Sequence, residues 1–142
     1  MPTDMRYIFD TNVIVSALLL KNSVVRQAFD RALGQGKLLI SQATIEELYY
    51  VLRRTDFDKY VHEDERLEFL VVLVHDATMV DITETVSECR DSKDNKFLEL
   101  AINGYATCII SGDDDLLILH PFRGIPILTP REFLQYAYES AK

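Results

Sequence analysis

The chain has 142 residues, of which 48% are hydrophobic and 27% are charged, and its formal net charge is −8. This composition is that of a globular protein with an ordinary core, and we expect residues 1–142 to form a single domain. The negative charge argues against nucleic-acid binding through a broad basic surface, because that binding neutralises phosphates with Lys and Arg. Two bound divalent cations would halve the charge, so a nucleic-acid substrate is not excluded.

The sequence also indicates where the protein works. No apolar run approaches the roughly 18 residues that a membrane helix needs, and residues 1–4 lack the basic segment that opens a secretory signal. Cys89 and Cys108 lack the close spacing of a zinc or redox motif. We therefore expect a cytoplasmic protein that has two reduced thiols and makes no membrane contact.

Short apolar runs alternate with longer helical patterns along the chain. This alternation favours an α/β fold with three layers, α/β/α, around a mostly parallel central sheet of about five strands. The predicted strands are Arg6–Phe9, Lys37–Ile40, Thr78–Val80, Thr107–Ile110 and Ile125–Leu128. The first and fourth are continuously apolar, as expected for strands that are buried on both faces.

The helical spacing of apolar residues, with capping residues before and glycines after, predicts five helices. They run from Asn22 or Ser23 to Leu33, onward from Ser41, over Glu63–Asp76, over Asp94–Asn103, and onward from Thr129-Pro130. Gly34 and Gly36 are the stop signals of the first helix, and Glu46 and Glu47 lie in the early turns of the second. The polar segment Arg53–Tyr60 is predicted to be a loop.

Acidic residues accompany these elements at one expected edge of the sheet. Asp10 follows the first strand and Asp113 the fourth, and ligands of open α/β sheets bind outside the carboxyl ends of the strands. Glu47 lies in the helix after the second strand, and Asp94 opens the helix before the fourth. Taken singly, each acid is an ordinary turn or helix residue. Taken together, they indicate one pocket, because gathered carboxylates repel each other unless they share protons or hold a cation.

The types of residue in and near this acidic group indicate which metal ion and which reaction it suits. Carboxylate oxygens suit Mg²⁺ or Mn²⁺, and a cation held there would activate water and neutralise charge that develops on a phosphodiester. Zinc is disfavoured because no His or Cys cluster accompanies the acids, and neither a GxGxxG nor a GxSxG string occurs. The small polar residues Thr11 and Asn12 are expected to turn the chain after Asp10. The candidate contacts for an RNA backbone are Arg53, Arg54, Lys93 and Lys96.

Four segments of the chain resemble the PIN-domain ribonucleases, which include the VapC-type toxins of toxin–antitoxin pairs. These segments are Tyr7–Val13, Ser41–Leu48, Asp91–Ala101 and Ile109–Leu117, in the order of the family. The resemblance implies a PIN-like fold and an acidic site for Mg²⁺ or Mn²⁺. The implied site consists of the catalytic metal ligands Asp10, Glu47, Asp94 and Asp113, the auxiliary metal ligand Asp115, and the supporting polar residues Asn12 and Ser111.

The resemblance further implies a hydrolytic endoribonuclease that is blocked by an antitoxin protein and is often a homodimer. Two registers within the motifs stay open. Asp91 competes with Asp94, which we favour because it opens the helix, and Glu46 competes with Glu47, which directly precedes the leucine of the family pattern. Asp114 is expected to point away from the site and to be replaceable.

Two other functions compete with a ribonuclease. A non-catalytic module would keep the acidic pocket and act only through a protein partner, so turnover by the partner-free protein would argue against it. A haloacid-dehalogenase-like phosphatase also places an Asp nucleophile after its first strand. That family needs a second acid two residues later, where this chain has Asn12.

Overall fold

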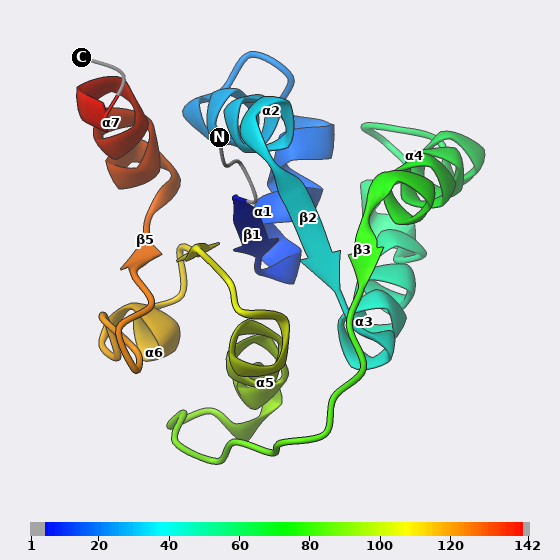
Figure 1. The fold of residues 1–142 in the computed structure, drawn as a ribbon. Coiled ribbons are helices and arrows are strands. Elements are labelled where there is room, and N and C mark those ends of the chain that lie inside the picture. Colours follow the sequence, from blue (N-terminus) through cyan, green and yellow to red (C-terminus); the bar gives the residue numbers. More distant parts are fainter. Residues whose placement is uncertain (1–4, 141–142) are drawn as a thin grey trace.

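The computed structural model describes residues 5–140, with side chains for residues 5–136. Its five strands are β1 (Arg6–Phe9), β2 (Lys37–Ile40), β3 (Thr78–Met79), β4 (Cys108–Ile110) and β5 (Ile127–Leu128). They form one sheet in the order β3-β2-β1-β4-β5, and every neighbouring pair is parallel (Figure 1). The predicted α/β class is confirmed. The first two strands have their predicted bounds, and the other three are one or two residues shorter.

Seven α-helices and two short 3₁₀ turns connect the strands in the part of the chain that the structure describes. The helices are α1 (Thr11–Leu19), α2 (Val24–Gln35), α3 (Gln42–Leu52), α4 (Glu63–Asp76), α5 (Asn95–Gly104), α6 (Asp114–Leu117) and α7 (Pro130–Ser140). The 3₁₀ turns are Thr55–Phe57 and Ser92–Asp94. Ser23 and Ser41 cap α2 and α3 as predicted, because each side-chain oxygen accepts a backbone N–H of the first turn.

Two predictions of local structure were wrong. The chain does not turn at Thr11 and Asn12: both are the first residues of α1, and Asp10 is its capping residue. The predicted stop at Gly34 is also absent, because α2 continues to Gln35 and Gly36 is the residue that follows it. A Cβ atom at Gly36 would lie 2.2 Å from the carbonyl oxygen of Met5, so the close approach to the chain before β1 requires glycine there.

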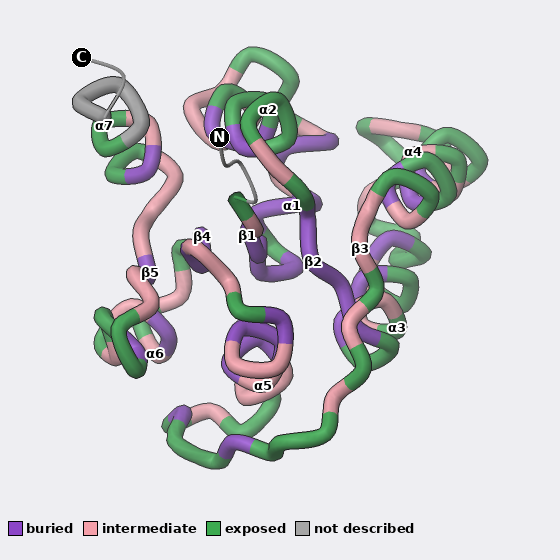
Figure 2. Tube along the Cα trace, in the orientation of Figure 1, coloured by how far each residue is buried: buried purple, intermediate pink, exposed green. Residues whose placement is uncertain are grey.

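Both faces of the sheet are covered by helices, and alternate residues of the strands contribute to two separate cores. Tyr7 and Phe9 pack with residues of α1, α2, α3, α4 and α7, whereas Ile8 packs with residues of α5 and α6. Figure 2 shows the buried residues concentrated along the central strands. Burial on both faces of the sheet explains why β1 is apolar at every position from Tyr7 to Phe9.

The strand order creates a reversal point beside β1. The chain moves outward from β1 through β2 to β3, and then returns to place β4 and β5 on the other side of β1. Connections on the two sides of such a point diverge, which leaves a crevice at the carboxyl ends of the adjacent strands. Asp10 follows β1 and Asp113 follows β4, so both lie at this crevice.

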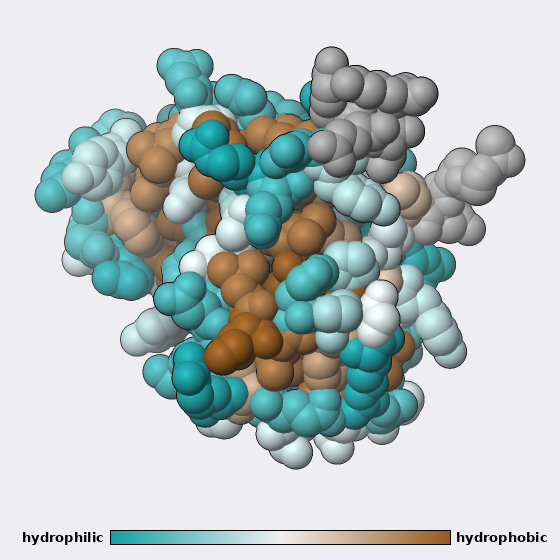
Figure 3. Space-filling view, turned by 90° about the vertical axis from the view of Figure 1, so that its left-hand side faces the viewer, coloured by the Kyte–Doolittle hydropathy of each residue, from teal (hydrophilic) through white to brown (hydrophobic). Residues whose placement is uncertain are grey.

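The side of the molecule at the β5 edge of the sheet presents apolar surface. Figure 3 shows the face that carries α6, β5 and α7, where hydrophobic side chains gather between hydrophilic ones. Ile118, directly after α6, is 67% exposed. No helix in residues 5–140 is long and apolar enough to cross a membrane.

Candidate active site

A pocket of about 110 Å³ opens at the carboxyl edge of the sheet. Its lining residues are Asp10, Thr11, Asn12, Glu47, Val51, Asp94, Phe97 and Asp113. The structure therefore brings together the four acids that the sequence predicts as catalytic, from four separate segments of the chain. Asn12, predicted as a supporting residue, lies at the exposed rim.

Asp10 is the most deeply buried of these acids. Its Oδ1 accepts the backbone N–H of Val13 at 2.8 Å, which caps α1, and its Oδ2 accepts the hydroxyl of Ser111. Burial raises the pKa of Asp10 above its usual value, and the hydrogen bonds from Ser111 and Val13 oppose that rise. The carboxylate is thus fixed in orientation by one group from α1 and one from the residue that follows β4.

Asp113 is held by the same serine. Its backbone N–H donates to Ser111 Oγ at 2.9 Å, and its Oδ1 accepts the backbone N–H of Asp115 at 2.8 Å, which caps α6. Ser111 is fully buried, and its hydroxyl group contacts both Asp10 and Asp113. Asp114, between the two acids, is exposed and does not line the pocket.

Asp94 ends the 3₁₀ turn that leads into α5. Its Oδ2 is buried and has no hydrogen-bond partner, the one such side-chain oxygen or nitrogen among the described residues. Burial, reinforced by the neighbouring carboxyl of Asp113, raises the pKa of Asp94 to about 7. A buried carboxylate oxygen without a hydrogen-bond partner, beside other carboxyl groups, suits a cation ligand, because a cation would both bind the oxygen and relieve the repulsion.

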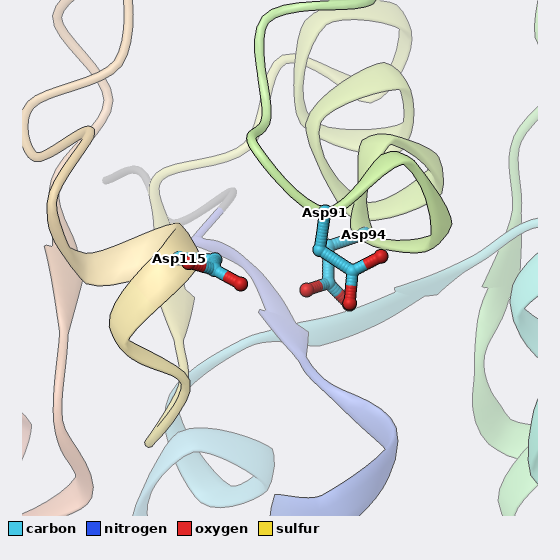
Figure 4. A group of neighbouring side chains, drawn as sticks. All are labelled: Asp91, Asp94 and Asp115. Carbon is cyan, nitrogen blue, oxygen red and sulfur yellow. The ribbon is translucent and has the colours of Figure 1, made fainter.

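Asp91 lies beside Asp94, so the ambiguity between these two positions has a structural basis. Figure 4 shows the two side chains next to each other, with Asp115 facing them from α6. Carboxylate oxygens of these three residues lie within 4.8 Å of one another. Asp94 belongs to this group and also lines the pocket, whereas Asp91 and Asp115 do not line the pocket. Asp115 also accepts a hydrogen bond from Arg90 Nε at 2.7 Å.

Glu47, on α3, completes the pocket. Its Oε2 accepts the hydroxyl of Thr11, and its Oε1 lies 2.8 Å from the ammonium of Lys96 on α5. Glu46 is exposed and lines a different groove near β3. The structure therefore places Glu47, and not Glu46, among the pocket acids.

A sequence model of the PIN domain matches residues 6–115 of this chain. The chain belongs to the PIN domain family. PIN domains are generally nucleases and use divalent metals. The match begins at β1 and ends at Asp115, so it includes every acid described above.

Individual relatives agree with this assignment. The chain is 26% identical to the uncharacterized protein MJ1680 of Methanocaldococcus jannaschii, over 92% of this chain and 90% of that protein. Its fold is similar to that of PAE2754 from Pyrobaculum aerophilum, with a TM-score of 0.62, 14% identity, and coverage of 96% of this chain and 91% of the other.

Two further structures of similar fold contain VapBC proteins. One is VapBC2 from Rickettsia felis bound to a DNA fragment from their promoter, with a TM-score of 0.57, 18% identity, and coverage of 87% and 97%. The other is DNA-bound VapBC from Salmonella typhimurium, with a TM-score of 0.55, 16% identity, and coverage of 89% and 98%. At these sequence identities, the likeness shows a shared fold alone.

The four basic residues predicted to contact an RNA backbone differ in whether they lie on the exposed surface or contact a pocket acid. Arg53 and Arg54 lie at the exposed end of α3, where they pair with Glu63 at 3.3 Å and with Asp56 at 3.1 Å. Lys93 is exposed beside the acids. Lys96, by contrast, is engaged by a pocket acid, and sequence analysis did not foresee that pairing.

Two further contacts in this PIN domain, of Thr11 with Glu47 and of Arg90 with Asp115, were not predicted from the sequence. For Thr11 a signal existed, since the hydroxyl directly follows the first acid in sequence. For Arg90 none existed, because its contact depends on the path of the irregular segment before Asp91.

Proposed function

We propose that this PIN domain, acting as one domain over residues 1–142, is a metal-dependent endoribonuclease that hydrolyses phosphodiester bonds of RNA in the cytoplasm. Its catalytic residues are Asp10, Glu47, Asp94 and Asp113, its cofactor is Mg²⁺ or Mn²⁺, and Asp115 is an auxiliary ligand. The observation that carries the proposal is the convergence of four carboxyl groups on one pocket at the reversal point of the sheet.

The donor set favours a hard divalent cation. Within the pocket the candidate ligands are carboxylate oxygens, with a threonine hydroxyl and an asparagine amide beside them, and no His or Cys lines it. A divalent cation held by such ligands supplies an activated water and neutralises negative charge on the phosphodiester that is cleaved.

The residues of the chain have separate tasks in this proposal. Ser111 and the Val13 N–H hold Asp10 in one orientation, so that it offers a fixed oxygen to a cation. Asp94, with a pKa of about 7, takes up a proton in the absence of a cation and loses it when one binds. Thr11 holds Glu47 at the side of the pocket, where it orients the cation or a water molecule.

The proposed substrate is a single-stranded segment of RNA. Tyr50 follows Glu47 by three residues on α3, so it projects from the same side of the helix, and it is 76% exposed. Exposed aromatic rings provide stacking surfaces for unpaired bases, and cationic groups beside them contact the backbone. Arg53 and Arg54 lie just beyond Tyr50, and the exposed Lys93 directly precedes Asp94 in the 3₁₀ turn before α5.

We also propose that the protein is the toxin of a toxin–antitoxin pair, with a protein antitoxin as its partner. The likeness of fold to the two VapBC structures supports this proposal. An apolar groove of about 430 Å³ between α2 and α4, with Phe29, Phe69 and Leu73 in its lining, offers surface to such a partner. The apolar face around β5 offers a second surface, at which a homodimer would form.

The deciding experiment is cleavage of a panel of RNAs by the partner-free protein, with Mn²⁺, with Mg²⁺ and with EDTA. Asp10→Asn should abolish cleavage, because it removes the buried charge but keeps an oxygen that accepts the Val13 N–H. Asp114→Asn is the matched control: it removes a neighbouring exposed charge and should leave cleavage intact.

Cleavage that persists in EDTA, or that survives Asp10→Asn, would overturn the proposal. A folded, partner-free protein that cleaves no RNA but binds a partner would instead support a non-catalytic module. Mass spectrometry of a complex that co-purifies from the native host would identify the partner.

A further inference from the structure

Lys96 is the single cationic side chain, among the residues that the structure describes, that forms an ion pair with an acid lining the pocket. Its ammonium lies 2.8 Å from Glu47 Oε1, and the two side chains are 21% and 25% exposed. The ammonium also lies 5.9 Å from the ring centroid of Phe97, which lines the pocket. Lys96 itself does not line the pocket, so the ion pair is a partly buried contact at the border of the pocket, on the Glu47 side.

The pair also connects the two helical layers. Glu47 comes from α3, which packs on one face of the sheet, and Lys96 from α5, which packs on the other. Their contact crosses the carboxyl edge where Asp10 and Asp94 lie. A positive charge at this place offsets part of the repulsion among the carboxyl groups, which otherwise opposes folding.

We propose that Lys96 is an internal counter-ion, which occupies the Glu47 corner of the pocket in the metal-free protein and competes there with the divalent cation. This inference rests on the proposed metal dependence. Only one of the two carboxylate oxygens of Glu47 is held by Thr11, so the other is available either to the ammonium or to a metal ion. Lys96 has a long flexible stem that allows the ammonium to leave when a doubly charged ion arrives.

This role differs from that of a surface residue that waits for RNA. Lys93, three residues earlier, fits the latter description, because it is exposed and its side chain has no ion pair among the described contacts. Lys96 instead sets the cation concentration at which the pocket fills. The enzyme then binds divalent cations at higher cation concentrations than a pocket of four carboxylates without a counter-ion would.

The test is direct measurement of Mn²⁺ affinity by calorimetry or by electron paramagnetic resonance, on the full chain without RNA. Lys96→Met keeps an unbranched side chain of similar length and removes the charge. It should tighten Mn²⁺ binding by about tenfold or more, because a unit charge at a few ångströms acts strongly in a partly buried site. The same substitution should lower the melting temperature in EDTA, since Glu47 loses its counter-ion.

Lys93→Met is the matched control, with the same change in net charge, and should alter the affinity by less than about threefold because exposed charges are screened. Lys96→Gln is a second variant, which should act in the same direction as Lys96→Met. In a Glu47→Gln background, the effect of Lys96→Met on Mn²⁺ affinity should shrink to that of the control. The carboxylate for which the ammonium and the cation compete is then absent.

These measurements test the proposed competition between Lys96 and the cation. Equal effects of the Lys96 and Lys93 variants, an undiminished effect in the Glu47→Gln background, or weaker Mn²⁺ binding by Lys96→Met would overturn the inference. Absence of Mn²⁺ binding by all variants would overturn it together with the proposed metal dependence. Tighter binding by Lys96→Met in a protein that cleaves no RNA would uphold it and contradict the proposed ribonuclease activity alone.

Discussion

The hydroxyl of Ser111 donates a hydrogen bond to Oδ2 of Asp10, although the two residues are 101 positions apart. The same oxygen accepts the backbone N–H of Asp113, so one buried hydroxyl connects the first and the last acid of the pocket. Both connections exist because β1 and β4 are adjacent and parallel, which places their following residues at one edge. The strand order thus determines the geometry of the site.

Replacement of this hydroxyl should affect both stability and metal binding. Ser111→Ala leaves Asp10 buried without its donor, and we expect a loss of about 1–3 kcal/mol in the free energy of unfolding, measured with urea. Mn²⁺ affinity should fall as well, because the carboxylate is no longer held in one orientation. Ser87→Ala, at an exposed position, is the control and should change neither quantity. A Ser111→Ala protein of unchanged stability would show that the hydrogen bond is not required.

The raised pKa of Asp94 should make the stability of the metal-free protein depend on pH. A folded-state pKa of about 7 lies above the value near 4 of an unfolded chain, so the folded protein keeps a proton that the unfolded chain releases. This contribution to stability is fully present below pH 4 and is lost as the pH rises through 7. Asp94→Asn cannot ionise, so its stability in EDTA relative to the wild type should rise between pH 4 and pH 8.

Urea unfolding at a series of pH values measures this difference. Asp114→Asn also removes one aspartate from the same region, but from an exposed position, and serves as the control. A difference between Asp94→Asn and the wild type that is the same at pH 4 and pH 8 would show that Asp94 does not retain a proton in the folded state.

Binding of Mn²⁺ should release protons, and the number released should depend on pH. At pH 6 the Asp94 carboxyl is protonated in the metal-free protein and must lose its proton to become a ligand, whereas at pH 8.5 it is already ionised. Calorimetry in buffers of different ionisation enthalpy counts the protons. We expect close to one more proton at pH 6 than at pH 8.5, and no such difference for Asp94→Asn.

The sequence predicted the sheet and the pocket acids because both depend on local patterns. Apolar runs of the right length identified the strands, and acids such as Asp10 and Asp113, which follow parallel strands, lie at the same edge of the sheet and meet where the strands are adjacent. The helix α1 was missed because a short polar residue such as Asp10 can start a turn or cap a helix by the same hydrogen bond. Local sequence did not distinguish the two, and the apolar run that follows proved to be helical.

The long basic side chains could not be placed from sequence. Arg90 and Lys96 reach partners 25 and 49 residues away, and such contacts depend on the path of the chain between them. The segment Arg53–Tyr60 was predicted to be a loop, and it contains the 3₁₀ turn Thr55–Phe57; its Arg54 carbonyl oxygen accepts a hydrogen bond from Arg66. That arginine, on α4, is fully buried, and its burial was not predicted from the sequence.

Arg66 should therefore be one of the most sensitive positions for stability. Its guanidinium donates to the carbonyl oxygens of Leu52 at 2.6 Å, of Arg54 at 3.2 Å and of Val61, and to Asp58 Oδ1 at 3.0 Å. Arg66→Met leaves these acceptors without a donor and should cost on the order of 3 kcal/mol or more in the free energy of unfolding. Arg66→Lys should also destabilise, because an ammonium lacks the planar fork. Arg31→Met, at an exposed site of α2, is the control.

The proposed path of single-stranded RNA predicts a role for Tyr50 in binding. RNA affinity is best measured by fluorescence anisotropy in an Asp10→Asn background, where the substrate is not cleaved. Tyr50→Ala should weaken binding of a single-stranded RNA by about 1–3 kcal/mol, the usual contribution of one stacked base. Tyr136→Ala, which removes an exposed tyrosine on α7, should leave the affinity unchanged.

The salt dependence of the same measurement separates stacking from backbone contacts. Arg54→Gln should reduce the slope of the logarithm of the affinity against the logarithm of the salt concentration by about 0.7, because one phosphate contact to a single strand is lost. Tyr50→Ala should leave that slope unchanged, since a stacked ring releases no counter-ions. Equal effects of Tyr50→Ala and Tyr136→Ala, or binding of duplex RNA as tight as that of a single strand, would contradict a path along the end of α3. The RNA would then approach the pocket from the side of Lys93.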